Sequence, residues 1–440
     1  MDYLSNIMFA ILLILGFGFF ANNVKKIIRN IKLGQNVDRF DNPSARWKNM
    51  ALIALGQQKM IKKPIMGILH IIVYVGFVII NIELLEIIID GLFGTHRIFA
   101  FLPFYNFLIA SFEILAFLVL VAVIIFWTRR NIIKLKRFIS SDLNGWPRSD
   151  ANYILYFEVV LMTLFLFMNG ADLFLQQQNY SHYHVAGSFP ISQFLIPVFN
   201  KFSVDNVALF EQIVWWLHIT GILIFANYLY FSKHLHILLA FPNTYFADLN
   251  VEGKFDNLKS VTNEVKLMMD PNADPFAAPA ADLNATPSKF GAADVHDLNW
   301  VQLLNAYTCT ECGRCTDACP ANITGKKLSP RKIMMQTRDR LEEVGKNIDK
   351  NKGIFIPDNK TLLNDYITAE ELWACTSCNA CVEECPVNIS PLSIILDMRR
   401  YLVMEQSAAP MSLNAMMANI ENNGAPWQYN QQDRLNWAND

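Results

Sequence analysis

The chain has 440 residues, of which 53% are hydrophobic and only 17% are charged. Its formal net charge is −2 at pH 7, so the sequence lacks the basic excess that accompanies nucleic-acid binding. The apolar residues are concentrated in the first half of the chain. This distribution predicts a membrane region followed by a more polar region.

Five apolar runs in the first half are long enough to cross a bilayer as helices, which takes ~20 residues each. We expect these spans at residues 3–21, 65–92, 99–127, 153–175 and 207–231. The first span has no basic segment before it and no small-residue cleavage site, so we expect an uncleaved anchor.

The charges of the connecting segments predict how the spans are oriented. Segment 22–63 carries ten Lys or Arg residues and segment 128–152 carries six, whereas the other two connections carry one each, Arg97 and Lys201. Basic loops stay in the cytoplasm. We therefore expect a multi-pass protein of the bacterial inner membrane with its N-terminus outside and its C-terminal half in the cytoplasm.

The sequence predicts four successive regions. A membrane domain (1–240) is followed by a segment (241–294) with an amphipathic stretch at 246–269 and a Pro/Ala linker that begins at Asp270. The remaining two regions are a cysteine-bearing domain (295–406), with helices such as 332–344 between its motifs, and a polar tail (407–440) that we expect to dock a partner.

All eight cysteines lie in two copies of C-x2-C-x2-C-x3-C-P, one from Cys309 to Pro320 and one from Cys375 to Pro386. This is the ligand run of a two-cluster [4Fe–4S] ferredoxin. Structural zinc sites use two spaced pairs of ligands, and disulfide frameworks need an oxidising compartment. The spacing therefore predicts two [4Fe–4S] clusters and one-electron chemistry.

In two-cluster proteins of this kind, the fourth cysteine of each run binds the other cluster. We therefore assign one cluster to the first thiol set, Cys309, Cys312, Cys315 and Cys385. The other cluster falls to the second thiol set, Cys375, Cys378, Cys381 and Cys319.

Histidines in or beside the spans are costly and mark function by default. His218 and His236 are eighteen residues apart, which is five turns and about 27 Å of a continuous helix. Both would then point from one face, whereas His234 would lie about 160° away. We predict His70 and His236 as the two ligands of a haem b near the cytoplasmic face; the alternative is interfacial histidines bonded to headgroups or backbone. We expect His96, His182 and His184 to be solvated in outer loops.

The stretch from Trp216-Leu-His218 to Phe231-Ser-Lys-His-Leu-His236 resembles the last helix of the cytochrome b (gamma) subunit of respiratory nitrate reductase. It also looks like the membrane subunit of heterodisulfide reductases. In that family the second and fifth helices hold two haems. His70, His218 and His236 match three of the four ligands, but Ile80 stands where the fourth would be. The resemblance implies either one haem or two, with His218 left for a second haem or for a quinone site.

His218 has carboxylates at similar depth or further out in the predicted spans. Glu113 is placed at a similar depth, and Glu83 and Glu86 nearer the outer end. Such a group could bind quinol and pass its protons outward. The alternative is that acids such as Glu86 and Asp90 lie in water at the interface.

The cysteine-bearing half resembles the small ferredoxin-like subunit of heterodisulfide reductases over residues 304–396. The tail segments Asn423-Gly-Ala-Pro-Trp427 and Arg434-Leu-Asn-Trp437-Ala look like the region that, in fused relatives, precedes domains with Cys-Cys-Gly motifs. Those relatives include membrane oxidoreductases that link electron-transfer flavoprotein to menaquinone. The resemblance implies a cytoplasmic partner with Cys-Cys-Gly domains, or a flavoprotein.

Together these features predict a mainly α fold, with a five-helix transmembrane cytochrome b bundle and a cytoplasmic α-helical dicluster [4Fe–4S] ferredoxin-like domain. The expected function is quinone-linked electron transfer by an oxidoreductase subunit whose substrate site lies on a partner chain, since no catalytic constellation is visible. The alternatives are a membrane-anchored iron–sulfur redox sensor and a component of a transporter.

Overall fold

A computed structural model describes residues 2–250, 253–271 and 289–438. This part of the chain is mainly helical and contains no strand beyond two isolated bridges, Gln35 with Asn299 and Leu363 with Ile367. The predicted mainly α class is therefore confirmed. The predicted Pro/Ala linker lies mostly at 272–288, outside the described residues.

Five helices of the described residues are long and apolar enough to cross a bilayer, as predicted. They are α1 (Asp2–Ile31), α4 (Pro64–Phe93), α5 (Tyr105–Asn131), α6 (Trp146–Gln177) and α8 (Val204–Tyr228). The third span was expected from residue 99, but Ile98–Phe101 forms a single 3-10 turn (η2) and α5 begins only after Pro103. Proline fits before a helix and not in its interior, which explains the later start.

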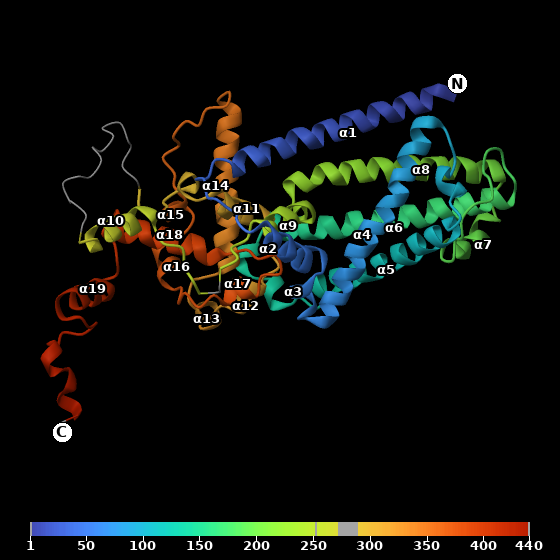
Figure 1. Cartoon of the computed structure of the whole chain (residues 1–440). Helices are drawn as coiled ribbons and strands as arrows, with labels where there is room; N and C mark the ends of the chain where they lie inside the picture. The colour runs from blue at the N-terminus through green and yellow to red at the C-terminus, as the bar shows by residue number, and fades with distance from the viewer. Residues whose placement is uncertain (1, 251–252, 272–288, 439–440) are drawn as a thin grey trace.

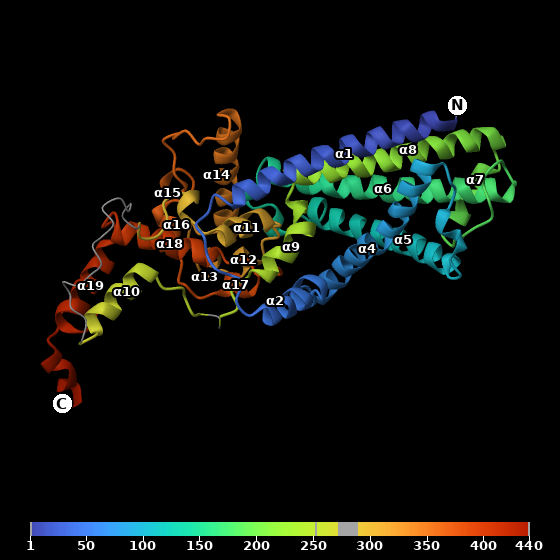
Figure 2. The ribbon, with the colours of Figure 1, turned by 45° about the horizontal axis from the view of Figure 1, so that its top comes forward.

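The five helices form an elongated bundle (Figures 1 and 2). α1 packs against α4 and α8, α4 against α5, and α6 against α5 and α8. Apolar side chains on the outer surface of α1 are largely exposed, among them Tyr3, Leu4, Ile7, Ile14 and Leu15. A face of this kind suits the hydrocarbon of a bilayer.

Short helices connect the spans at both ends of the bundle. At the end near the cysteines these are α2 (Pro43–Met50), η1 (Ala51–Leu55), α3 (Gln58–Ile61), η3 (Lys136–Phe138) and η4 (Ser141–Leu143). The opposite end carries η2, η5 (Ser192–Leu195) and α7 (Ile196–Phe199). We call these the inner and the outer end of the bundle.

The fifth span does not continue as one straight helix. α8 ends at Tyr228, and two 3-10 turns follow, η6 (Leu229–Phe231) and η7 (Lys233–Leu235), before α9 (His236–Tyr245) begins. Between the turns Ser232 is extended, with φ −119° and ψ 145°, and its hydroxyl accepts the N–H of His234. The prediction that His218 and His236 share one face of a continuous helix is therefore wrong.

The cysteine domain, defined here as residues 289–406, is built from short helices around one long helix, α14 (Pro330–Lys350). The others are η8 (Val295–Asp297), α11 (Trp300–Thr308), α12 (Arg314–Asp317), α13 (Pro320–Ile323), α15 (Leu362–Asp365), α16 (Ala369–Trp373), α17 (Ala380–Glu383) and α18 (Pro391–Met404). Proline at the first position and a polar cap begin α14 and α18, because that proline needs no N–H partner. Among the described residues of the predicted amphipathic stretch 246–269, those of α10 (Lys259–Met269) are helical and the others are not.

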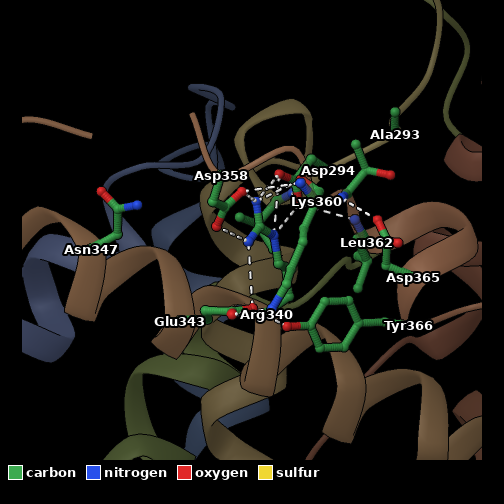
Figure 3. Close-up of polar contacts among 12 residues, drawn as sticks. Ala293, Asp294, Arg340, Glu343, Asn347, Asp358, Lys360, Leu362, Asp365 and Tyr366 are labelled. Carbon is green, nitrogen blue, oxygen red and sulfur yellow. Dashed lines mark hydrogen bonds and ion pairs between the residues drawn. The ribbon is translucent and has the colours of Figure 1, made fainter. Parts of the chain in front are cut away.

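Arg340, in the middle of α14, is the polar centre of this domain (Figure 3). Its side chain is fully buried and donates to Asp294 on one side and to Asp358 and the Lys360 carbonyl on the other. Arg340 hydrogen bonds lower the pKa of the Asp358 carboxyl. One guanidinium thus fixes α14 to the segments before α11 and before α15.

The cysteine domain packs directly on the inner end of the bundle. Ile27 of α1 and Phe225 of α8 belong to the same buried apolar cluster as Leu303 and Ile333 of the cysteine domain. The membrane and cysteine domains therefore share a core. Packed apolar side chains join them, in addition to the predicted linker.

Polar contacts reinforce this interface. α1 extends ten residues past its predicted end to Ile31, where the Asn30 amide donates to the Tyr307 hydroxyl at 2.8 Å. Arg331, which is fully buried, donates to Asp142 in η4 at 2.6 Å and to the Arg137 carbonyl at 2.7 Å. These contacts lie on separate elements of the bundle and hold the cysteine domain in one orientation.

The last described segments, α19 (Met411–Asn423) and η9 (Gln431–Ala438), extend from the far side of the cysteine domain, opposite the N-terminus (Figures 1 and 2). Their side chains are largely exposed and include Met411, Trp427, Tyr429, Leu435 and Trp437. They add nothing to the core.

Candidate electron-transfer site

The two cysteine loops have the same backbone. Glu311 and Gly313 in the first loop have φ of 55° and 77°, and the equivalent Ser377 and Asn379 in the second have φ of 56° and 61°. Left-handed residues at these two positions curl each loop tightly. The first three cysteines of each loop are thereby brought close to one another.

The structure brings the thiols of the two loops close together. The whole first thiol set lines one pocket, although Cys385 comes from the second loop, and Cys381 of the second set lines this pocket too. The thiols of Cys319, Cys375, Cys378 and Cys381 likewise lie within electrostatic range of one another. All eight cysteines are free thiols. Four convergent thiols are the donor set of a [4Fe–4S] cluster, so the residues present fit two such groups. No three His, Cys, Asp or Glu side chains of the described part of the chain form a site for a bare metal ion.

Burial raises the pKa of the Cys309 thiol to about 12 and that of Cys385 to about 11. A metal centre bound by these sulfurs would hold them as thiolates. The backbone N–H of Ile389 donates to Cys385 Sγ at 3.3 Å, and that of Ser377 to Cys375 Sγ at 3.4 Å. Hydrogen bonds to the sulfurs are one of the means by which a protein sets a cluster's potential.

The two sets differ in exposure. Cys309 and Cys385 of the first set are buried against the inner end of the bundle, where Arg314 donates to the Lys59 carbonyl of α3 at 3.1 Å. The second loop also contacts the inner end, where Lys59 pairs with Glu383 at 3.8 Å, but its Cys378 is the one cysteine of the eight that is exposed.

Glu311, inside the first cysteine loop, connects this loop to the membrane domain. Its carboxylate forms ion pairs with Lys233 in η7 and with Arg338 in α14, the latter at 2.7 Å. Burial would raise the pKa of Glu311, but the two cations outweigh it and the pKa is lowered. The sequence analysis missed this residue, since its partner Lys233 is distant in the sequence.

Three histidines gather at the inner end, near the first thiol set. The rings of His234 and His236 are 5.4 Å apart, and both lie within electrostatic range of His70. His236 Nδ1 donates to the Lys233 carbonyl at 3.1 Å, which leaves Nε2 free to bind a metal. The prediction that His234 faces away is wrong, because the break at Ser232 turns it towards the other two.

These histidines have the chemistry of haem ligands. Burial lowers the pKa of His236, and burial together with His236 lowers that of His234 to about 3, so burial favours the neutral imidazole in both. His70 Nδ1 is buried and has no hydrogen-bond partner among the described residues. Neutral imidazoles with a free nitrogen fit a haem iron.

Further out, a cavity of about 90 Å³ lies between α4, α5, α6 and α8. Most of its lining is apolar and includes Ile80, and its polar residues are Asn81, Glu83, Glu158 and His218. His218 Nδ1 is buried without a hydrogen-bond partner in the described part. Glu113, expected beside His218, does not line the cavity and accepts the N–H groups of Ile191 and Ser192. Glu158 was missed by the sequence analysis.

The outer end holds a buried ionic network around Arg97. Its guanidinium donates to Glu83 at 2.6 Å, to Asp172 at 2.9 Å and to Asn169 at 2.6 Å. Burial would lower the pKa of Arg97, but Asp172 and Glu83 outweigh it and raise the pKa well above its ordinary value.

Two expectations about the outer end are corrected by this network. Glu86 is not in water: it is buried and accepts the Tyr105 hydroxyl at 2.9 Å and the Phe99 N–H. His96 is not solvated either, because its Nε2 bonds Asp172 at 3.0 Å and its side chain is 14% exposed. His182 and His184 are exposed, as expected.

Comparison with known proteins supports the interpretation of the thiol sets. Residues 308–389 match the family described as "4Fe-4S dicluster domain". The chain is 30% identical to the "Probable iron-sulfur-binding oxidoreductase FadF" of Bacillus subtilis, over 96% of this chain and 59% of that protein. It is 25% identical to the "EtfAB:quinone oxidoreductase" of Syntrophomonas wolfei, over 92% of this chain and 55% of the relative.

A third relative matches a smaller part of the chain. It is one polypeptide of the "Ferredoxin/F(420)H(2)-dependent CoB-CoM heterodisulfide reductase" of Methanosarcina acetivorans, and it is 32% identical over 24% of this chain and 52% of its own length. This agrees with the resemblance to heterodisulfide reductases. No solved structure matches the chain.

The chain spans between half and three fifths of the length of the relatives from Bacillus subtilis and Syntrophomonas wolfei. Similarity to them covers the apolar helices as well as the cysteine loops. The chain is thus a homologue of iron–sulfur oxidoreductases, with a 4Fe–4S dicluster domain beside five helices that are long and apolar enough to cross a bilayer.

Proposed function

We propose that the chain is a membrane-bound electron-transfer subunit of an oxidoreductase, which links a quinone in the bilayer to a cytoplasmic partner. The observation that carries this proposal is the position of the first thiol set, directly against the inner end of the bundle and beside the buried histidines. When bound, two [4Fe–4S] clusters and a haem b supply the one-electron steps. The protein's own residues hold these groups, position them and control access to water.

In this proposal the two thiol sets hold one cluster each, and His70 and His236 hold one haem b. The Lys233 carbonyl fixes the His236 ring through Nδ1, so Nε2 would be available to hold the haem iron. The Glu311–Lys233 ion pair keeps the first cysteine loop close to these histidines.

The quinone would occupy the cavity that contains His218. A quinone needs an apolar site with a few polar groups near its ring oxygens. His218, Glu83, Glu158 and Asn81 supply such groups in an otherwise apolar lining. Because Ile80 cannot ligate iron, we assign His218 to the quinone and not to a second haem.

The partner would approach the second thiol set. Cys378 is exposed, and the tail beyond residue 406 presents apolar side chains on the same side of the molecule as the cysteine domain. We propose a cytoplasmic partner with Cys-Cys-Gly domains or a flavoprotein. The basic inner loops support a bacterial inner-membrane location with the cysteine domain in the cytoplasm and the N-terminus outside.

Metal and haem analysis of the anaerobically purified protein tests the proposal. We expect about eight cluster irons and a pyridine haemochrome signal of about one haem per chain. His70→Ala and His236→Ala should lose the haem but keep the cluster iron, while His184→Ala, an exposed outer residue, should keep both. Menadiol, a soluble quinol, should reduce the wild-type protein.

Other results would contradict parts of the proposal. If His70→Ala keeps its full haem content, the ligand assignment is wrong. If the protein holds clusters but no haem and menadiol does not reduce it, the quinone-linked function fails, and a membrane-anchored redox sensor becomes the better interpretation.

A further inference from the structure

One guanidinium at the outer end is shared by three buried carboxylates. Arg97 contacts Glu83 at 2.6 Å, Asp172 at 2.9 Å and Glu86 at 3.8 Å, and none of the three carboxylate side chains is more than 4% exposed. One positive charge cannot balance three negative charges away from water. We therefore expect at least one of these carboxylates to be protonated. The network can then release a proton or accept another one.

The inner side of this network opens on the cavity. Glu83 lines the cavity together with His218, and its Oε2 is buried with no hydrogen-bond partner among the described residues. Its Oε1 accepts a hydrogen bond from the Arg97 guanidinium. Glu83 therefore has one oxygen free for a group inside the cavity while the other stays fixed.

The outer side of the network reaches the surface. Asp172 Oδ1 bonds His96 Nε2 at 3.0 Å, and the His96 ring is 6.0 Å from that of His182, which is exposed. The two ring nitrogens of the His96 imidazole allow it to accept a proton on one side and donate one on the other. A path of titratable groups thus leads from the cavity to the surface that lies opposite the cysteine domain.

We propose that Glu83, Asp172 and His96 carry protons between the quinone cavity and the outer surface, with Arg97 as a positioning residue. Arginine stays protonated, so it holds the two carboxylates close together and does not relay the proton itself. Transfer between the carboxylates would pass through a water between them.

The proposal rests on the proposed quinone-linked function. Each quinol that becomes quinone loses two electrons and two protons, the O–H bonds breaking as the ring becomes oxidised. The electrons leave towards the thiol sets, and Glu83 accepts the protons one at a time and returns to its starting state as each moves outward. Quinone reduction runs the same path inward.

The other titratable groups at this end are already engaged elsewhere. Asp90 accepts the Arg97 N–H and the Thr95 hydroxyl, and the Tyr105 hydroxyl donates to Glu86. Tyr183 donates to Glu211 at 2.7 Å. None of these groups lines the cavity, so Glu83 is the point at which the network meets it.

The test uses the full-length protein with its cofactors, reconstituted in liposomes, and menadiol as the electron donor. We expect Glu83→Gln, Asp172→Asn and His96→Ala to slow reduction by menadiol at least about tenfold. Dithionite delivers electrons without binding in the quinone cavity. It should therefore reduce the three variants as fully as the wild type. The control is His184→Ala, an exposed residue of the outer end that does not line the cavity and should behave as the wild type.

Two other outcomes would contradict the proton path or the quinone function. Wild-type rates in Asp172→Asn and His96→Ala would overturn the proton path and leave the quinone function standing. A wild-type protein that menadiol cannot reduce would overturn both.

His96→Ala guards against a misfolded Asp172→Asn, because it leaves all the contacts of Arg97 in place. Added imidazole can replace a missing proton carrier at a site near the surface, so it should restore the rate of His96→Ala. A slow variant that imidazole does not restore would show a structural role for His96 and would overturn its part in the path.

Discussion

Glu311 shows how one residue can couple a cofactor loop to a membrane helix. It lies between Cys309 and Cys312, yet its carboxylate is buried between Lys233 of the fifth span and Arg338 of α14. The spacing of the cysteines could be predicted from the sequence because the ligand pattern is local. The role of Glu311 could not be predicted, because it depends on Lys233, which lies near it only in the folded chain.

Replacing Glu311 by Gln should destabilise the docked cysteine loop. The change leaves Lys233 and Arg338 as buried cations without their carboxylate, at a cost of roughly 3 kcal/mol. We expect the visible absorption of the clusters to be lost at a lower urea concentration than in the wild type. Glu384→Gln, which removes a partly exposed partner of Lys63, is the control and should change little. Equal urea midpoints for Glu311→Gln and wild type would contradict this role.

At the scale of elements, the two cysteine loops repeat one backbone and exchange their fourth sulfur. Both loops use left-handed residues at the same two positions. Cys385 crosses over to line the pocket of the first loop. The exchange follows from the packing of α12 against α17.

The effect of replacing a single cysteine should therefore depend on the thiol set to which it belongs and not on the loop that carries it. We expect Cys312→Ser and Cys385→Ser to alter the same electron paramagnetic resonance signal of the reduced protein. Cys319→Ser and Cys378→Ser should alter the other one. If Cys385→Ser instead groups with Cys378→Ser, the assignment of the fourth sulfurs is wrong.

The end of the fifth span marks the limit of sequence-based prediction at this scale. The apolar run predicted the helix, but a straight-helix calculation placed His234 and His236 on opposite faces. The break at Ser232 is stabilised by distant groups: Asp150 accepts the Lys233 N–H at 3.2 Å, and the Lys233 ammonium donates to the Pro147 carbonyl at 2.6 Å. Periodicity carries no information on such contacts.

At the scale of the whole molecule, the cysteine domain and the bundle share one apolar core. The sequence predicted both parts and their order but treated them as tethered modules. Their contact depends on the extension of α1 beyond its apolar run, where Asn30 meets Tyr307 and the backbone of α14. Because this extension is polar, the sequence predicted a connecting segment there and not a continuation of the helix.

Gly345 in α14 tests this contact. A Cβ atom at this position would lie 2.5 Å from the Asn30 amide, so a larger side chain must displace Asn30 from Tyr307. We expect Gly345→Val to destabilise the docked state by about 1–3 kcal/mol, seen as a lower melting temperature and faster hydrogen exchange at the end of α1. Gly18→Val, where the added atom meets nothing within 4 Å, is the control. An unchanged melting temperature in Gly345→Val would show that this contact contributes little.

The exposure of Cys378 also affects how the isolated protein should behave in air. It is the most accessible of the eight sulfurs, so dioxygen and peroxide reach the second thiol set before the first. Iron should consequently be released from the two sets at different rates during aeration. A bound partner that covers Cys378 would remove that difference, and oxidative damage could then be used to report occupancy of the docking face.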